Sequence, residues 1–178
     1  GRLGVGVNPL RGQNNVQGSC DMGSFPHEFV GYRHVSDDTV REQFSSMWGV
    51  TLREDPGMRI PNMLDSAVAG EFRGIYIQGE DIAQSDPNTN HVAGALRAME
   101  CVIVQDLFLN ETSHFAHVFL PGTSFLEKDG TFTNAERRIN RVRPVMISRT
   151  GLSEWEATCA LSEAMGYPMQ YESASEIM

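Results

Sequence analysis

Residues 8–23 surround one cation with amides and glycines. The stretch is Asn-Pro-Leu-Arg-Gly-Gln-Asn-Asn-Val-Gln-Gly-Ser-Cys-Asp-Met-Gly, and Arg11 is its only basic residue. Amide side chains donate and accept hydrogen bonds without titrating, and glycines let a ligand come close. A guanidinium in such surroundings can bind both oxygens of a carboxylate. The stretch therefore indicates a polar binding loop around Arg11, or else a solvated loop whose asparagines and glycines form turns.

The same string resembles formate dehydrogenase alpha subunits of the molybdopterin oxidoreductase family, and Asn-Ala-Glu-Arg-Arg at 134–138 resembles a motif that is common to many members of that family. The resemblance implies a longer enzyme that oxidises formate to carbon dioxide, using molybdenum or tungsten on two molybdopterin guanine dinucleotides. It implies that Arg11 holds formate and that Gln13 and Asn14 lie beside the pterin. The family's metal-ligating cysteine or selenocysteine and its iron–sulfur cysteines belong to other segments. We therefore expect no metal ligand here, an inactive isolated chain, and the rest of the alpha subunit and electron-transfer subunits as partners.

A second group of polar residues follows two apolar runs. Gly-Glu-Asp at 79–81 comes after the first run, and Gln105 and Asp106 come after the second. Ligands of parallel α/β sheets bind beyond the carboxyl ends of strands, so we expect one shared crevice. Its side chains can bind ribose or guanine, although capping of a helix by Asp81, Ser85 or Asp86 is an alternative. The resemblance places the guanosine end of one dinucleotide against Gly79, Glu80, Asp81, Gln84, Ser85, Gln105 and Asp106.

Other candidate sites are weaker. Gly4-x-Gly6 lacks the third glycine of a nicotinamide fingerprint. His114-x-x-His117 has metal-ligand spacing but no third ligand at a useful distance in the sequence. The three cysteines lie far apart, so neither a disulfide framework nor a metal knuckle is indicated, and Cys20 is expected to be a small packed residue. Arg137 and Arg138 can close an ion-pair network with Glu136 or approach a phosphate, and we favour the network.

Composition excludes several classes of partner. The 178 residues are 40% hydrophobic and 21% charged, which is typical of a globular domain. A net charge of -9 without a long basic run argues against nucleic acid and anionic membrane surfaces. No apolar run approaches the roughly 20 residues of a membrane-spanning helix, so we expect a cytoplasmic protein without membrane contact.

The elements that must position these residues alternate between helix and strand. Apolar runs predict buried strands at 74–78, 101–104 and 118–120. Periodicity predicts helices at 39–48, from Pro61 to Gly70, at 90–99, at 111–116 and from Ser153 to Met165, with looser order between Gly122 and Pro144. Their inward residues are Val40, Phe44 and Met47, then Met63, Leu64, Ala67 and Val68, then Val92, Ala95, Leu96 and Met99. Strands that are apolar throughout predict an α/β fold, a three-layer αβα arrangement with a mainly parallel sheet.

The resemblance also suggests how the chain is divided. Residues 1–23 are expected to form the substrate-arginine strand and pterin-facing loop, 24–125 part of the dinucleotide-binding domain, and 126–178 the start of a neighbouring domain. The non-methionine start and the final Ser-Glu-Ile-Met suggest an internal fragment. Two alternatives remain: a cofactor-less, molybdopterin-like subunit of a respiratory NADH dehydrogenase, and a free-standing nucleotide-binding module.

Overall fold

The structure is a computed structural model, and it describes residues 12–177. Arg11, the expected formate ligand, lies outside the described residues. The chain divides into two compact units. Among the described residues, the first unit takes 12–58 and 131–141, and the second takes 59–130 and 142–177.

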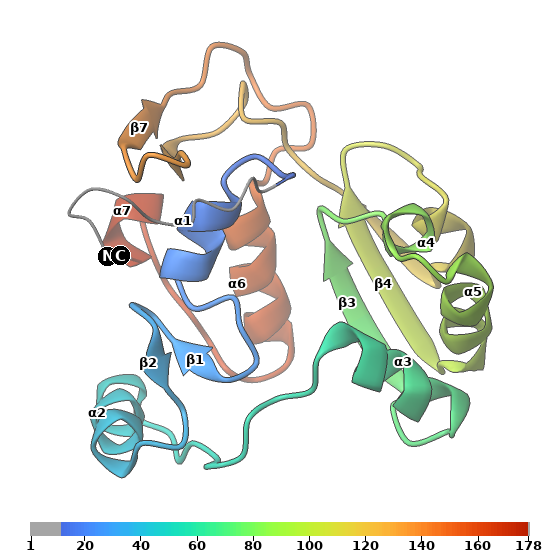
Figure 1. The fold of residues 1–178 in the computed structure, drawn as a ribbon. Helices are drawn as coiled ribbons and strands as arrows, with labels where there is room; N and C mark the ends of the chain where they lie inside the picture. Colours follow the sequence, from blue (N-terminus) through green and yellow to red (C-terminus); the bar gives the residue numbers. More distant parts are fainter. Residues whose placement is uncertain (1–11, 178) are drawn as a thin grey trace, which may run out of the picture. The chain divides into compact units, whose positions relative to one another are not determined.

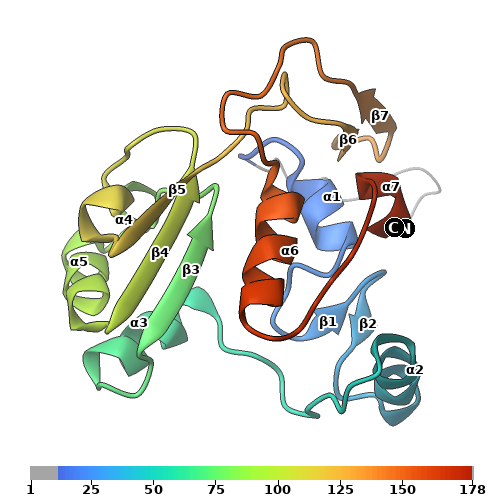
Figure 2. The same cartoon turned by 180° about the vertical axis from the view of Figure 1, so that it is seen from behind.

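The second unit is built on a parallel sheet. Its strands are β3 (Gly74–Gln78), β4 (Cys101–Asp106) and β5 (Val118–Pro121), and β4 lies between the other two (Figures 1 and 2). The register pairs Ile75 with Val102 and Val104 with Phe119. The three predicted strands are therefore present, and the expected α/β class with a parallel sheet is confirmed.

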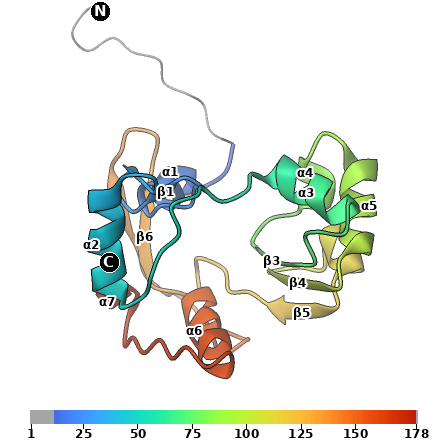
Figure 3. The same cartoon turned by 90° about the horizontal axis from the view of Figure 1, so that it is seen from below.

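Helices cover one face of this sheet and form the core with it. They are α3 (Ile60–Val68), α4 (Ile82–Ser85), α5 (Thr89–Ala98) and the 3-10 helix η1 (Thr112–Phe115), and Figures 1 and 3 show α3, α4 and α5 on the same side. The buried side chains are Leu64, Ala67, Ile77, Ile82, Val92, Ala95, Leu96, Met99, Val102 and Val104. Most of the residues that the sequence predicts to face inward in this unit are thus buried. Val68 is an exception, because it ends α3 and its side chain is 56% exposed. On the other face Tyr76, Ile103 and Leu120 are half-buried.

The first unit contains short elements around an aromatic cluster. These are α1 (Val16–Asp21), the paired strands β1 (Glu28–Phe29) and β2 (Arg33–His34), and α2 (Asp38–Trp48). The Phe44 ring of α2 is stacked on that of Phe29, with centroids 4.6 Å apart. The Asp37 carboxylate caps α2 by accepting from the Val40 N–H at 3.2 Å, and Gly49 ends the helix at φ 67°. The prediction that Met47 is inward is wrong, since it is 64% exposed.

The segment after β5 is more ordered than the sequence predicts. Two paired strands, β6 (Gly130–Thr133) and β7 (Ile139–Val142), occupy part of the stretch that we expected to consist of turns. That expectation is wrong because the strands are short and half-exposed, and they lack the apolar runs that marked the buried strands. The last predicted helix is confirmed as α6 (Glu154–Ala164), and α7 (Ala174–Ile177) follows it. None of the helices within 12–177 is both long and apolar enough to cross a membrane.

Candidate functional site

The two predicted polar groups lie at one edge of the parallel sheet. Gln78 and Gln105 are register partners at the carboxyl ends of β3 and β4. The Gly79 N–H then donates to the Gln105 carbonyl at 2.9 Å. Gly79 has φ 66°, a left-handed conformation that glycine adopts without strain, and the chain turns there into the segment 80–85. The residues predicted to share a crevice are therefore neighbours along this edge.

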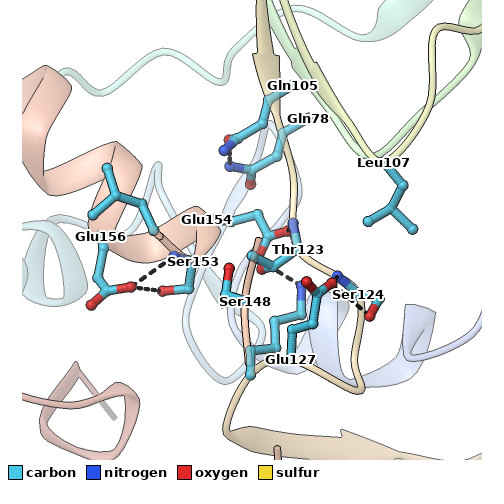
Figure 4. Close-up of polar contacts among 12 residues, drawn as sticks. Gln78, Gln105, Leu107, Thr123, Ser124, Glu127, Ser148, Ser153, Glu154 and Glu156 are labelled. Atoms are coloured by element: carbon cyan, nitrogen blue, oxygen red, sulfur yellow. Dashed lines mark hydrogen bonds and ion pairs between the residues drawn. The ribbon is translucent and has the colours of Figure 1, made fainter. Parts of the chain in front are cut away.

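Gln105 is almost completely buried, with a side chain 2% exposed. Its Oε1 accepts a hydrogen bond from the Tyr76 hydroxyl. It also accepts from Gln78 Nε2 at 2.8 Å (Figure 4). A buried amide needs such partners, because an unpaired polar group away from water is costly. The Gln105 side chain therefore fixes the ends of two strands.

Asp81 connects the segment after β3 to the segment after β4. Its Oδ1 accepts from the Thr112 N–H at 3.0 Å and from the Thr112 hydroxyl at 2.6 Å. The same hydroxyl oxygen accepts from the Ala83 N–H at 3.0 Å. Asp81 makes no side-chain cap of α4, the helix that follows it. The capping alternative holds in another form, because Asp81 accepts from the N–H of the first residue of η1. Its partner Thr112 is 31 residues away, and no local pattern in the sequence marks it.

Loss of the Thr112 hydroxyl is expected to destabilise this edge. Thr112 is fully buried, and Thr112→Val keeps its shape but leaves the Ala83 N–H and one acceptor position of Asp81 unpaired. We expect the free energy of unfolding to fall by about 1 to 3 kcal/mol in urea titrations. Thr89→Val, at the exposed start of α5, should change it by less than about 0.5 kcal/mol. Equal losses in the two variants would contradict this role of Thr112.

The remaining residues of the edge are more open. The Ser85 hydroxyl donates to Glu80 Oε1 at 2.5 Å, and Gln84 and Ser85 are exposed. Asp106 orders the turn after β4, because its Oδ1 accepts from the Leu107 N–H at 2.6 Å and its Oδ2 from Asn110 Nδ2 at 2.9 Å. The edge therefore presents carboxylate and amide groups whose positions are set by short internal hydrogen bonds.

A polar cluster that the sequence analysis missed follows β5. The half-buried carboxylate of Glu154 accepts from the Thr123 N–H at 2.8 Å, the Thr123 hydroxyl at 2.9 Å and Lys128 Nζ at 2.6 Å (Figure 4). Glu154 lies within the capping box that starts α6, in which the Ser153 N–H and Oγ donate to Glu156. The cluster ties the segment after β5 to the start of α6.

A second carboxylate orders the same segment. Glu127 accepts from the Ser124 N–H and hydroxyl, both at 2.8 Å (Figure 4). It also accepts from the Arg149 N–H at 3.2 Å. The Ser124 bonds and the Arg149 N–H lower the pKa of Glu127, because they stabilise its charged form. Burial of the Glu154 carboxylate raises its pKa, but the bonds from Lys128 and Thr123 outweigh burial and leave that pKa below its ordinary value of 4.5.

The lowered pKa of Glu154 makes its contribution to stability dependent on pH. A carboxylate with a depressed folded-state pKa stabilises the fold above its unfolded-state pKa, and this stability is lost as pH falls through the folded value. We expect Glu154→Gln to lower the free energy of unfolding at neutral pH by about 1 to 3 kcal/mol. The difference from the native chain should shrink in urea titrations below the ordinary value of 4.5.

Glu163→Gln is the matched control for this prediction, since Glu163 is exposed on the same helix. It should change stability by less than about 0.5 kcal/mol at any of these pH values. A Glu154→Gln difference that stays constant down to acid pH would contradict the ionised contact with Lys128.

The amide-rich stretch lies in the first unit. Gln13 and Asn14 are exposed, and Asn15 adopts φ 59° just before α1. Asn15 Oδ1 accepts from the Thr133 N–H at 2.9 Å, although the two residues are 118 positions apart in sequence. The amide-rich stretch therefore lies beside the residue that precedes the motif at 134–138. In that motif Arg138 Nε lies 3.2 Å from Glu136, and both side chains are exposed. This surface pair includes only one of the two arginines of the network that we favoured. Cys20 is buried, as expected for a packed thiol.

Comparison with known proteins agrees with the family resemblance of the sequence. The family model described as molybdopterin oxidoreductase matches residues 1–164. Formate dehydrogenase H of Escherichia coli (strain K12) is 42% identical over 99% of this chain, which covers 25% of that protein. The F420-dependent formate dehydrogenase 1 subunit alpha of Methanococcus maripaludis is 46% identical over 93% of this chain, which covers 24% of that protein.

A solved structure supports the fold. Acetylene hydratase from Pelobacter acetylenicus matches with a TM-score of 0.57 at 18% identity, over 74% of this chain and 19% of its own. At this level of identity the likeness concerns the fold alone, and it is consistent with an αβα arrangement. The chain spans about a quarter or less of the length of these proteins.

Proposed function

Since this chain belongs to the molybdopterin oxidoreductase family, we propose that the whole protein is a formate dehydrogenase that oxidises formate to carbon dioxide. The observation that carries the proposal is Arg11 within the string from Asn8 to Gly18. The formate dehydrogenases at 42% and 46% identity support it. Electron-transfer subunits and iron–sulfur clusters outside this chain complete the proposed enzyme.

Arg11 binds the carboxylate of formate in this proposal. A guanidinium stays charged at any physiological pH and matches both carboxylate oxygens at once. Two parallel hydrogen bonds fix the direction of the C–H bond, which lowers the entropic part of the barrier. The amides of Gln13 and Asn14 lie next to Arg11 in sequence and are proposed to contact the pterin.

The proposed cofactor is a pair of molybdopterin guanine dinucleotides with molybdenum or tungsten. When bound, it supplies a metal centre that takes up two electrons from formate. The sheet edge has a donor and acceptor set that fits the guanosine end, because carboxylates accept from the N1–H and N2 amino group of guanine. Thr112 uses only Oδ1 of Asp81, so among the described residues Oδ2 is left for such a ligand. Gln105 and Asp106 hold this edge in place.

Nucleotide selectivity tests the proposed guanosine contact. We expect calorimetry on the chain to show GDP binding about tenfold more tightly than ADP, since adenine lacks the donors that a carboxylate recognises. Glu80→Gln should reduce this preference, whereas Glu111→Gln, an exposed change of the same charge, should not. Equal affinity for GDP and ADP would remove the guanine assignment.

Cofactor content separates the proposal from its main alternative. A cofactor-less subunit of a respiratory NADH dehydrogenase is not favoured by relatives that are named formate dehydrogenases. The complete gene product, purified and analysed by metal mass spectrometry and pterin fluorescence, should contain molybdenum or tungsten together with pterin. Absence of both from a folded preparation would favour the alternative.

A further inference from the structure

We propose that a cavity at the amino-terminal edge of the parallel sheet binds a small oxyanion, a carboxylate or a phosphate. The cavity has a volume of about 370 Å³ and is lined by Leu96, Arg97, His114, Phe115 and His117. His117 directly precedes β5, and its ring contacts the start of β4 at Val102. The candidate guanosine edge lies at the opposite, carboxyl ends of the same strands. The two sites are therefore distinct.

Arg97 supplies a positive charge that is held in place. Its guanidinium carbon lies 5.0 Å from the centroid of the Phe115 ring. A cation–π contact with an aromatic face takes up none of the guanidinium's hydrogen-bond donors, so its N–H groups can bind an acceptor. Within residues 12–177 Arg97 has no acidic partner, and Glu100, which follows α5, is paired with Arg73 at 2.9 Å. The carboxyl end of α5 opposes an anion only weakly compared with this full charge.

His117 adds a donor whose position on the ring is fixed. The backbone N–H of Val102 donates to His117 Nδ1 at 2.9 Å, and the backbone N–H of His117 donates to the Val102 carbonyl at 2.8 Å. A ring nitrogen that accepts a hydrogen bond carries no proton, so the neutral ring carries its proton on Nε2. The ring can therefore offer the cavity an N–H donor.

The same bonds argue against a metal ion between the two histidines. Coordination through Nε2 would move the ring proton to Nδ1, where it would face the Val102 N–H and break that bond. Arg97 would also repel a cation. The described part of the chain contains no group of three or more histidine, cysteine and acidic side chains that could hold a metal ion. The His114-x-x-His117 pair is thus better suited to bind an oxyanion than a metal.

Nuclear magnetic resonance of the histidine rings tests this site. Inorganic phosphate and acetate are titrated into the 15N-labelled chain at constant pH and ionic strength. We expect saturable shifts of the His114 and His117 ring signals with at least one probe, and the better probe shows whether a phosphate or a carboxylate fits. Arg97→Gln should weaken binding about tenfold. Arg59→Gln, an equal loss of charge at the exposed residue before α3, should leave it unchanged.

His117→Asn provides a second variant with the fold retained, because the asparagine side chain keeps an acceptor for the Val102 N–H but loses the Nε2 donor. It should also weaken binding. The absence of saturable shifts with both probes would overturn the proposal, as would equal affinities of the native chain and Arg97→Gln.

Discussion

Arg11→Lys in the complete gene product is expected to lower kcat/KM for formate roughly ten- to hundredfold. Lysine keeps the charge but loses the planar fork, so a bound carboxylate can rotate and its C–H bond is no longer held in one direction. Loss of one charge-assisted hydrogen bond costs about 1.5 to 3 kcal/mol, which corresponds to this range of rates. Arg11→Ala removes the charge as well and should lower kcat/KM for formate further.

The measurement is steady-state kinetics beside metal and pterin content for each variant. Arg53→Lys is a suitable control, because Arg53 is an exposed residue with only a 3.5 Å surface ion pair to Asp55. It should keep native kinetics. If Arg11 only braces its loop, both Arg11 variants should lose cofactor or misfold. Full cofactor occupancy with unchanged kcat/KM would exclude Arg11 as the formate ligand.

Leu64→Ala is expected to cost about 2 to 5 kcal/mol of unfolding free energy, the typical loss when a buried leucine leaves a cavity. Leu64 is 1% exposed and belongs to the core between α3, α5 and the sheet. Val68 lies one turn further along α3 and was predicted from the sequence to face inward as well. It is 56% exposed, so Val68→Ala should change stability by less than about 0.5 kcal/mol.

Urea unfolding of the two α3 variants, followed by circular dichroism, distinguishes the structure from the sequence pattern. The structure predicts a large loss for Leu64→Ala alone. Similar losses for both variants would mean that α3 buries Val68 too, as the sequence pattern suggested. A small loss for Leu64→Ala would contradict the described core.

Local signals explain why much of the second unit could be predicted. The strand from Gly74 to Gln78 is a short apolar run between turn residues, and its bounds match the structure. Val92, Ala95 and Leu96 have helical spacing and are all buried. These features depend on neighbours in sequence. Val68 was misplaced because periodicity does not show where the end of a helix leaves the sheet.

The missed features either lack a buried apolar run or depend on partners far away in sequence. The β6–β7 pair turns at Asn134, whose Oδ1 accepts from the Glu136 and Arg138 N–H groups at 3.0 and 2.9 Å. Its short strands carry no buried apolar run. In the candidate site, the sequence placed Asp81 and Gln105 at one sheet edge. It gave no sign that Thr112 or Thr123 would hold carboxylates there, since each partner is 31 residues distant.

Formate-dependent reduction of a viologen dye by the complete, cofactor-loaded gene product tests the central proposal most directly. The proposal predicts that dye reduction requires formate, and that carbon-13-labelled formate gives an equal amount of labelled carbon dioxide. Preparations with full metal and pterin occupancy that leave labelled formate unchanged would contradict it.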